Sequence, residues 1–358
     1  MKKLSAWIQK NERHLSSLAI IVGFIGDAIA FPNIEIDLAV LILGSYLVIA
    51  AGCIVILHIF EGIKGGGFLG RMVRQWFPLI TAFALGGLLS AFLAFYSFTG
   101  SIAKSWPLVI LVAAIMIGNE WLRSYRSRLP FQTSILFLVS FSFAALVTPL
   151  YVHHIGPDTF TIAGAATVAA FWLFIELLGL TSRKRYSESR KSIIQGAAAV
   201  FVIVNILYFT NTIPPIPISL KSSGVYHSVV KNGSDFTVTY EPQPWYAFFS
   251  PEVIHVGPHD TVYALSAVFA PSLLSTTVVH RWEKYDPLAG VWTTDSIFSF
   301  AIEGGRDGGY RGYTAKPALT PGTWRVSVET PRGEVIGRIT FSVVAAGVPP
   351  ALRTKVIQ

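Results

Sequence analysis

The sequence predicts a multispan α-helical membrane domain of seven transmembrane helices, followed by an all-β domain of the immunoglobulin-like sandwich class. Three observations predict this fold. Hydrophobic residues make up 52% of the 358 residues and charged residues only 13%, whereas soluble chains carry roughly 25% charge. Seven apolar runs of membrane-spanning length lie before residue 214. After residue 217, apolar and polar residues alternate with a period of two, as in half-buried strands.

The boundary between the two halves lies in the segment from Lys191 to Ile218. The last apolar run stops at Asn211 and is followed by three prolines between residues 214 and 217. Proline lacks a backbone N–H and clashes with the preceding turn, so it ends a helix. We therefore expect a membrane domain over residues 1–213, a Pro-rich linker over 214–224, a β-sandwich over 225–346 and a flexible tail over 347–358.

The membrane half is predicted from hydropathy and length. Crossing a hydrocarbon core of about 30 Å takes about 20 mostly apolar residues in a helix. The N-terminus has the outline of a signal peptide, but the six apolar runs that follow favour a first transmembrane helix. The expected spans are His14–Phe31, Ile36–Phe60, Trp76–Thr99, Ser105–Trp121, Phe131–Ile155, Phe160–Leu180 and Ser192–Ile213.

The orientation follows from the connecting segments, because short cytoplasmic loops carry the excess of Lys and Arg. Basic residues gather before the first span and in every second loop, 15 of them in total, whereas the intervening loops hold only Lys104. This asymmetry predicts a cytoplasmic N-terminus. After seven crossings, the chain from Pro214 onward lies outside the cytoplasm.

The formal net charge of +8 does not indicate a nucleic-acid partner. Before Pro214 there are 16 Lys and Arg against 9 acidic residues, and from Pro214 onward there are 12 against 11. The basic excess therefore belongs to the membrane half, where it sets topology. Cys53 is the one cysteine, which excludes an intramolecular disulfide.

Three ionisable residues within the predicted spans are candidate functional residues, because charge at membrane depth is costly. Asp27 lies near the outer end of the first span, and Glu176 and His58 lie near inner ends. The two carboxylates at opposite faces argue against one paired-carboxylate centre. Both a polar pathway and a purely interfacial role remain open for them.

Several short motifs match the sequence patterns of nucleotide-binding or metal-binding sites but lie outside the structural setting that such sites require. Residues 65–70 satisfy G-x-G-x-x-G, but between two spans rather than between a strand and a helix. His153 and His154 form an adjacent pair without a third spaced ligand. We expect no cofactor and no metal.

The C-terminal half contains about seven short strand-like runs separated by Gly, Pro, Asn and Asp. In the run from Thr323 to Glu329, Trp324 alternates in phase with two valines, so we expect Trp324 to be buried. Pro331 and the two residues after it predict a hairpin turn to the next run, 334–344. Several short strands in about 130 residues favour the sandwich.

Aromatic side chains and arginines of this domain are candidates for binding, because aromatic rings stack on sugar faces and arginine forks bind carboxylate or phosphate. A position in the core is the alternative for the aromatic rings. The proposed ligand-binding residues are Arg311, Tyr313, His280, Trp282, Tyr285 and Trp292.

One part of the chain resembles a known family. The segments His280–Trp282, Tyr310–Lys316, Pro321–Val326 and Gly337–Val343 resemble domain-of-unknown-function family 2914, over roughly Val262 to Val344. This family is a C-terminal module of bacterial membrane proteins and brings no established activity. The resemblance implies a bacterial inner membrane and an envelope setting.

Three functions are compatible with the sequence. The first is a non-enzymatic membrane protein, embedded in the lipid bilayer, whose periplasmic β domain binds an envelope glycan, lipid headgroup or protein. The second is a transporter or sensor that uses Asp27 and Glu176. The third is a membrane enzyme acting on lipid or lipid-linked sugar. The β domain lacks a Ser-His-Asp set, which favours binding over catalysis.

Overall fold

The computed structural model describes residues 36–62, 67–98, 129–181, 183–213, 218–243, 251–270, 274–304, 308–347 and 351–357. The chain divides into two compact units, with the boundary between Ile213 and Pro214.

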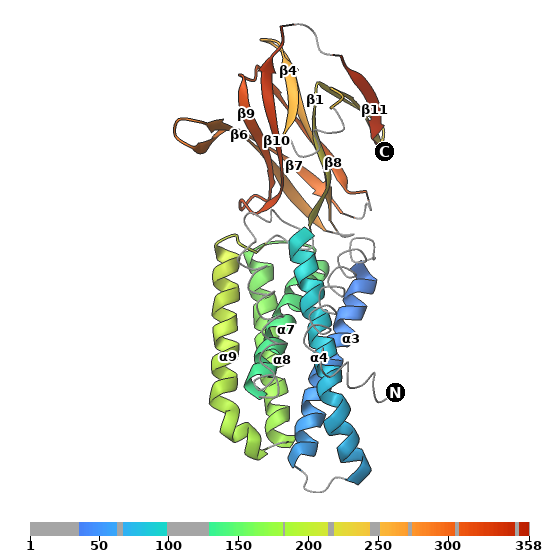
Figure 1. Cartoon of the computed structure of the whole chain (residues 1–358), viewed down its shortest axis with the longest axis vertical. Helices are drawn as coiled ribbons and strands as arrows, with labels where there is room; N and C mark the ends of the chain where they lie inside the picture. Colours follow the sequence, from blue (N-terminus) through green and yellow to red (C-terminus); the bar gives the residue numbers. More distant parts are fainter. Residues whose placement is uncertain are drawn as a thin grey trace, which may run out of the picture. The chain divides into compact units, whose positions relative to one another are not determined.

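The first unit contains five long apolar helices that run side by side (Figure 1). Each is long and apolar enough to cross a membrane, which indicates a membrane protein. The helices are α3 (Ile36–Gly62), α4 (Gly67–Phe98), α7 (Leu129–Val152), α8 (Pro157–Thr181) and α9 (Arg183–Phe209).

The described residues thus hold five helices of this kind rather than the seven predicted. The expected spans His14–Phe31 and Ser105–Trp121 lie outside the described residues. Four of these helices begin earlier than predicted, and the difference is largest for α4, which begins at Gly67, and α9, which begins at Arg183. Hydropathy marks the depth of the hydrocarbon, whereas helical hydrogen bonding continues into the polar interface, so helix ends and span ends differ.

The end of α9 explains why the helical half stops where it does. Asn211 adopts the left-handed conformation with a φ of 53°. The Asn211 N–H donates to the Tyr208 carbonyl at 3.0 Å, and the Thr212 N–H donates to the Leu207 carbonyl at 2.9 Å. This pair of bonds is a Schellman motif, which satisfies the last helical carbonyls. The prolines that follow then prevent the helix from resuming.

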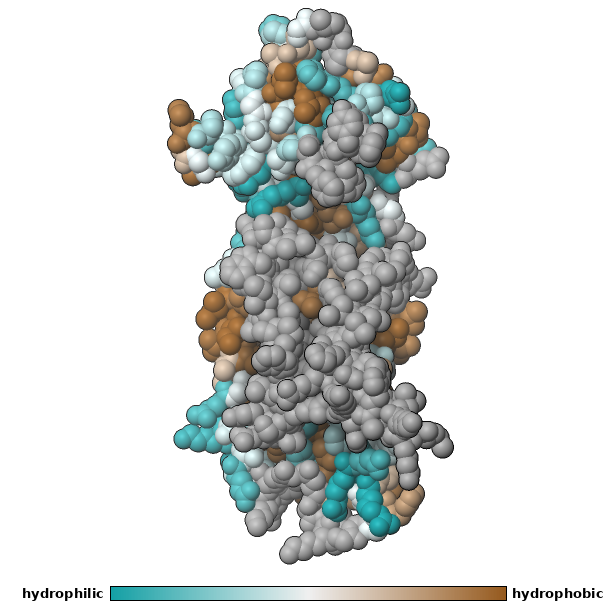
Figure 2. Space-filling model, in the orientation of Figure 1, coloured by the Kyte–Doolittle hydropathy of each residue, from teal (hydrophilic) through white to brown (hydrophobic). Residues whose placement is uncertain are grey.

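Aromatic side chains fill the contact among α7, α8 and α9. Phe141 of α7 lies 5.2 Å from Phe160 of α8 and 5.9 Å from Phe201 of α9, measured between ring centroids. Phe160 also stacks on Tyr208. Outward-facing leucines and valines remain exposed on the helices, and Figure 2 shows hydrophobic residues along the flanks of α9 and α3. Such exposed apolar flanks suit a lipid environment.

The second unit is rich in β-structure. Its strands form three sheets with the orders β1-β5-β8, β4-β10-β9-β6-β7 and β11-β3-β2. The strands are β1 (Ser219–Tyr226), β2 (Ser228–Asn232), β3 (Asp235–Tyr240), β4 (Glu252–Val256), β5 (Thr261–Phe269), β6 (Ser275–Asp286), β7 (Val291–Glu303), β8 (Tyr310–Pro317), β9 (Gly322–Glu329), β10 (Val335–Ala345) and β11 (Arg353–Ile357).

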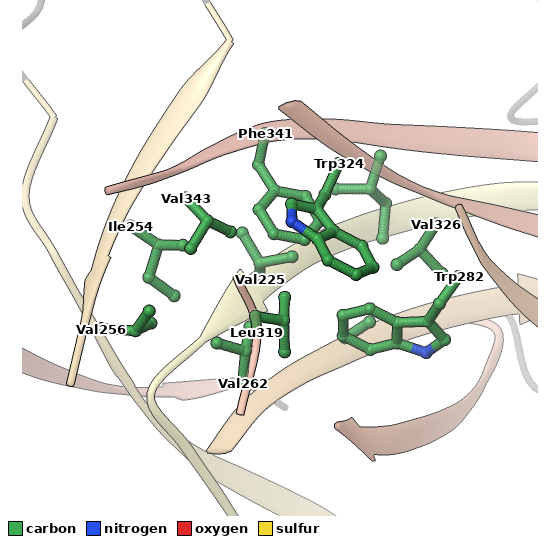
Figure 3. Close-up of a cluster of buried hydrophobic side chains, with 12 residues drawn as sticks. Val225, Ile254, Val256, Val262, Trp282, Leu319, Trp324, Val326, Phe341 and Val343 are labelled. Carbon is green, nitrogen blue, oxygen red and sulfur yellow. The ribbon is translucent and has the colours of Figure 1, made fainter. Parts of the chain in front are cut away.

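Side chains of the sheet β1-β5-β8 and of the five-stranded sheet share one hydrophobic core. Val225 and Val262 contribute from the first sheet, and Trp282, Trp324 and Phe341 from the second (Figure 3). Trp324 is 2% exposed, so the prediction that it is buried is confirmed. The Trp282 and Phe341 rings meet edge to face at 6.2 Å, a favoured aromatic geometry.

The predicted hairpin between residues 323 and 344 is also confirmed. Strands β9 and β10 pair antiparallel, with Trp324 opposite Phe341. At the turn, the Thr330 N–H donates to the Glu334 carbonyl at 2.9 Å, and Gly333 has a φ of 80°. Glycine tolerates this left-handed conformation without steric cost.

The ends of the β domain differ from the expected boundaries. Strand β1 begins at Ser219, inside the segment 214–224 that was expected to be a linker. The segment 347–358 was expected to be a flexible tail, but Arg353–Ile357 forms β11 and pairs antiparallel with β3. Ile357 packs against a small hydrophobic cluster that includes Phe236 and Val238.

Candidate functional site

The candidate site lies on the outer face of the five-stranded sheet, the face opposite the shared core. Along β9, Trp324, Val326 and Val328 belong to the hydrophobic core, and Arg325, Ser327 and Glu329 alternate with them. Ser327 and Glu329 are themselves buried, and Arg325 is partly exposed. Successive side chains of a strand point to opposite faces. The polar set therefore shares the outer face with residues of the neighbouring strands. The outer-face network consists of Arg281, Glu283, Arg325, Ser327, Glu329 and Arg338.

Strand register brings these six residues together. Arg281 of β6 and Arg338 of β10 both lie directly opposite Ser327 of β9. In the next row, Glu283 of β6 lies opposite Arg325. The register between β6 and β7 shifts between Trp282 and Glu283, which marks a bulge at the edge of the network.

Glu283 is the centre of the network. Arg325 forms a bidentate ion pair with Glu283. The Arg325 Nε donates to Glu283 Oε2 at 2.6 Å, and the Arg325 Nη2 donates to Glu283 Oε1 at 2.8 Å. The Ser327 hydroxyl donates to Oε2 at 2.8 Å. The Glu283 side chain is 9% exposed, so this carboxylate is held in one orientation and largely shielded from water. Bidentate arginine–carboxylate pairs are among the strongest and most directional in proteins.

A second ion pair and a third arginine complete the network. Arg281 Nε donates to Glu329 Oε2 at 3.0 Å, and the Glu329 side chain is 7% exposed. Arg338 Nε donates to the Ser327 hydroxyl at a longer 3.4 Å. The network therefore contains three arginines and two carboxylates, an excess of one positive charge.

The electrostatics agree with this arrangement. Burial opposes ionisation of Glu283, but hydrogen bonds from Arg325 and Ser327 and the charges of Arg325 and Arg338 outweigh it and lower its pKa. Burial lowers the pKa of Arg338, and so does the neighbouring charge of Arg325, whereas Glu283 and Glu329 raise it. The Glu283 carboxylate therefore stays ionised at neutral pH.

One end of the outer face is aromatic. The Arg325 guanidinium lies 4.2 Å from the centroid of the Trp292 ring, a cation–π contact. Tyr285 lies opposite Trp292, and their ring centroids are 5.2 Å apart. These are two of the predicted ligand-binding residues, and the structure places them beside the network.

Beyond this aromatic pair, the β6–β7 hairpin presents an apolar tip, brown in Figure 2. Leu288 at the tip is 99% exposed. Asp286 fixes the turn, because its Oδ1 accepts from the Leu288 N–H at 2.9 Å and the Ala289 N–H at 3.2 Å.

The structure contradicts the assignment of His280 and Trp282 to a ligand face, because both are 0% exposed. His280 Nε2 bonds the Ser266 hydroxyl at 2.8 Å, and Nδ1 bonds the Thr314 hydroxyl at 2.9 Å. Trp282 Nε1 donates to Thr314 Oγ1 at 3.1 Å. This buried polar cluster joins β6 to the sheet β1-β5-β8. Burial lowers the pKa of His280 to about 4, so the ring is neutral.

Arg311 and Tyr313 lie on β8, in the three-stranded sheet β1-β5-β8. Tyr313 is 40% exposed and contacts Phe236 and Tyr263, with centroid distances of 6.2 Å and 6.1 Å. Arg311 is half-buried. The predicted set of six residues therefore divides among the core, β8 and the outer face, and does not form one site.

The membrane candidates do not form one described site. His58 is 2% exposed, and its Nδ1 lies 2.7 Å from the Ile54 carbonyl of the same helix. Glu176 lies on the exposed face of α8. Asp27 lies outside the described residues.

Sequence reasoning missed a second polar cluster, made by residues spaced fourteen apart. Glu241 Oε1 accepts from His227 Nε2 and Oε2 accepts from His255 Nδ1, both at 2.7 Å. The His255 N–H also donates to Oε1 at 2.6 Å, and Gln243 Nε2 donates to the Val253 carbonyl at 2.9 Å. Glu241 and Gln243 thus cover the open edge of β4, as edge strands require.

Burial opposes ionisation of Glu241, but the bonds from His255 and His227 outweigh it and lower its pKa. Among the described residues, no group of three or more His, Cys, Asp and Glu side chains is arranged to hold a metal ion. The cluster of Glu241 is a hydrogen-bonded unit that ties β4 to the chain around β2 and β3.

No curated protein matches the chain. Among solved structures, the Pseudomonas fluorescens alkylpurine DNA glycosylase AlkC bound to DNA containing an abasic site analog shares 10% identity at a TM-score of 0.22. That comparison covers 87% of this chain and 100% of the glycosylase, and a TM-score this low carries no argument.

The family comparison, in contrast, falls on the candidate site. The matched segment begins at residue 275 and ends at residue 343, which is shorter than the expected stretch from Val262 to Val344. All six residues of the outer-face network lie within it. The C-terminal part of this chain, over residues 275–343, matches the family DUF2914, a protein of unknown function.

Proposed function

We propose that the protein is a seven-span protein of the bacterial inner membrane whose extracytoplasmic, immunoglobulin-like β domain binds an envelope component without catalysing a reaction. The partner is a glycan, a lipid headgroup or another protein. The N-terminus lies in the cytoplasm and the β domain on the periplasmic side. The five apolar helices, the loop charges and the core shared by two sheets support this architecture.

The observation that carries the binding proposal is the outer-face network beside Trp292. A rigid set of ionised side chains next to an aromatic pair is a preorganised polar surface. Preorganisation lowers the entropy lost when a partner binds. The network lies within the segment that matches the family. The His280 cluster lies largely in the same segment but is buried and inaccessible.

The two alternatives have less support. A transporter or sensor would use Asp27, Glu176 and His58, but Glu176 lies on an exposed helix face and His58 bonds its own helix. A membrane enzyme needs clustered polar groups in the spans. The described polar clusters lie in the β domain.

Photocrosslinking in living cells tests the proposal. A photoreactive amino acid replaces Thr340 or Thr294, which are exposed and lie opposite Arg325 and Glu283 on the outer face. The control site is Asn232, exposed on β2. We expect adducts of a defined mass from both outer-face positions and none from Asn232. Absence of adducts at the outer face, or equal adducts at all three sites, would contradict the proposal.

A further inference from the structure

We propose that β7 pairs along its open edge with β7 of a second copy of this chain, so that two β domains share one continuous sheet. The segment that pairs runs from Ser296 to Ile302 and is called the open edge. The pairing goes beyond the proposed function, because it uses the side of the five-stranded sheet and not its outer face. The free backbone of the segment, its composition and its exposed side chains carry the proposal.

The backbone of β7 has a partner on one side. In the order β4-β10-β9-β6-β7, β7 is the last strand. It pairs with β6 along its length, from Val291 opposite Asp286 to Glu303 opposite Ser275. On its other side, no strand of the described part of the chain pairs with it. About every second N–H and C=O of this 13-residue strand is therefore available to another strand.

Proteins protect such edges with charged residues, prolines and bulges. The first part of β7 has two of these devices, because Asp295 is the unpaired residue of the bulge and its charge is bonded to Lys316. The open edge that follows reads Ser-Ile-Phe-Ser-Phe-Ala-Ile, with no charge, no proline and no further shift of register. Uncharged segments of high β-propensity associate edge to edge. We therefore expect this edge to be covered in the native assembly.

Side chains of the open edge are exposed on both faces of the sheet. Ile297, opposite Arg281, is 53% exposed, and Phe298, on the other face, is 36% exposed. Ser299 and Ala301 are also exposed. Apolar side chains exposed on both faces leave an edge strand without a solvated side, and a strand added in the plane of the sheet would cover both rows.

A second copy of the open edge complements the first. Antiparallel pairing about a two-fold axis at Ser299 places Phe298 opposite the partner's Phe300 and Ile297 opposite the partner's Ala301. The first pair is aromatic and the second sets a large side chain against a small one, both of which suit cross-strand neighbours. The paired segment holds no charge, so no like charges meet. Copies confined to one membrane also meet at a high effective concentration.

Disulfide crosslinking of the full chain in isolated membranes tests the pairing. Cys53→Ala removes the one natural cysteine, and Ser299→Cys then places a single thiol at the proposed axis. Directly opposite residues of antiparallel strands have Cα atoms about 4.5 to 5.5 Å apart, which is within the range of disulfides. We expect mild oxidation to convert most of this variant into a species of twice the mass of the chain.

Thr293→Cys in the same background is the matched control. Thr293 is exposed on the same strand but lies before the bulge. In the proposed dimer, its Cα atom and that of the partner's Thr293 are roughly 40 Å apart, so this variant should stay monomeric.

A second pair of variants tests the edge itself. Ala301→Lys, added to Ser299→Cys, places a charge opposite the partner's Ile297 and should lower the crosslinked fraction at least fivefold, because edge lysines oppose pairing. Thr293→Lys should leave that fraction unchanged. Tryptophan fluorescence during urea unfolding checks that both variants keep the fold.

Three results would overturn the dimer. They are no crosslink from Ser299→Cys, equal crosslinking from Thr293→Cys, and an adduct of a mass other than twice that of the chain, which would make the occupant another protein. Unchanged crosslinking in folded Ala301→Lys would place the contact elsewhere. Photocrosslinks at Thr340 do not depend on this edge, so loss of the dimer alone leaves the proposed function intact.

Discussion

Protonation of His280 should weaken the β domain, and the size of the effect follows from the burial of the ring. The imidazole is 0% exposed and bonded to Ser266 and Thr314. In the neutral form, one ring nitrogen donates and the other accepts. A second proton would bury a charge, and neither of the two groups bonded to the ring is a carboxylate, so burial lowers the pKa of His280 from 6.5 to about 4.

The direction in which stability changes with pH follows from the difference in proton binding between the folded and unfolded states. The folded pKa of His280 lies below the unfolded value, so the unfolded chain binds more protons between about pH 4 and pH 6.5. The stability contributed by the neutral ring is therefore complete above about pH 6.5 and is lost as the pH falls towards and through 4. One pKa unit corresponds to about 1.4 kcal/mol, so acidification from pH 7.5 to pH 5 should cost roughly 2 kcal/mol.

Urea denaturation of residues 218–358, followed by tryptophan fluorescence at pH 7.5 and pH 5, measures this loss. We expect the fragment to be soluble and β-rich, because the domain has its own core. The control is His280→Gln, which keeps a donor and an acceptor but does not titrate. This variant should be less stable than the unmodified fragment at pH 7.5, with a smaller loss on acidification.

At pH 5, the carboxylates whose pKa is lowered, Glu241, Glu283 and Asp295, remain ionised. Glu252 and Glu334, whose pKa is raised by burial, act in the opposite direction and do so equally in both proteins. The difference between the two pH dependences therefore isolates His280. Identical pH dependences in the two proteins would show that His280 does not cause the loss of stability.

Three further predictions concern the core, the network and the topology. Trp324→Ala should lower the unfolding free energy by about 3 to 5 kcal/mol, because the ring is 2% exposed, and a loss below about 1 kcal/mol in urea melts would contradict its core position. Arg325→Ala should lower the unfolding free energy by about 3 kcal/mol, because it leaves the shielded Glu283 carboxylate without its ion-pair partner. Adding Glu283→Gln should recover part of that loss, and no recovery would argue against the ion pair. A reporter active only outside the cytoplasm should be on when fused after Gln358 and off after Arg128, and the reverse pattern would overturn the orientation.

Part of the β domain was predictable because alternation reports the two faces of a strand. Trp324, Val326 and Val328 share one phase, and the structure buries all three. The same rule applied to β6 would have placed His280 and Trp282 in the core, in phase with Val278. The side-chain chemistry of His280 and Trp282 suggested ligand binding, but their positions in the alternating pattern of β6 predicted burial correctly.

Only part of the outer-face network could be predicted from the sequence. Alternation already placed Arg325 and Glu329 on the polar face of one strand. Their partners on β6 and β10 depend on sheet order and register, which the sequence does not encode locally. The shift between Trp282 and Glu283 further breaks the period that would locate Glu283. The bonds of Glu241 with His227 and His255 likewise depend on contacts between separate strands.

The membrane half was predictable in outline because hydrophobicity determines which helices lie in lipid. The helix ends were less predictable, because α4 and α9 begin in polar sequence, at Gly67 and Arg183, before their apolar runs. The segment 347–358 was wrongly predicted to be a flexible tail, because β11 contains only five residues and depends on pairing with β3. Short edge strands gain most of their stability from the neighbouring strand rather than from their own sequence.

Cysteine labelling in whole cells shows whether the outer face of the β domain is accessible from outside the cytoplasm. Cys53 is the one natural cysteine, so Cys53→Ala provides a background in which Thr340→Cys, exposed beside Arg325, is the single thiol. A membrane-impermeant maleimide should label this thiol in intact spheroplasts, and the purified envelope ligand should slow the reaction. Labelling that appears only after the cells are lysed would place the β domain in the cytoplasm and contradict the account.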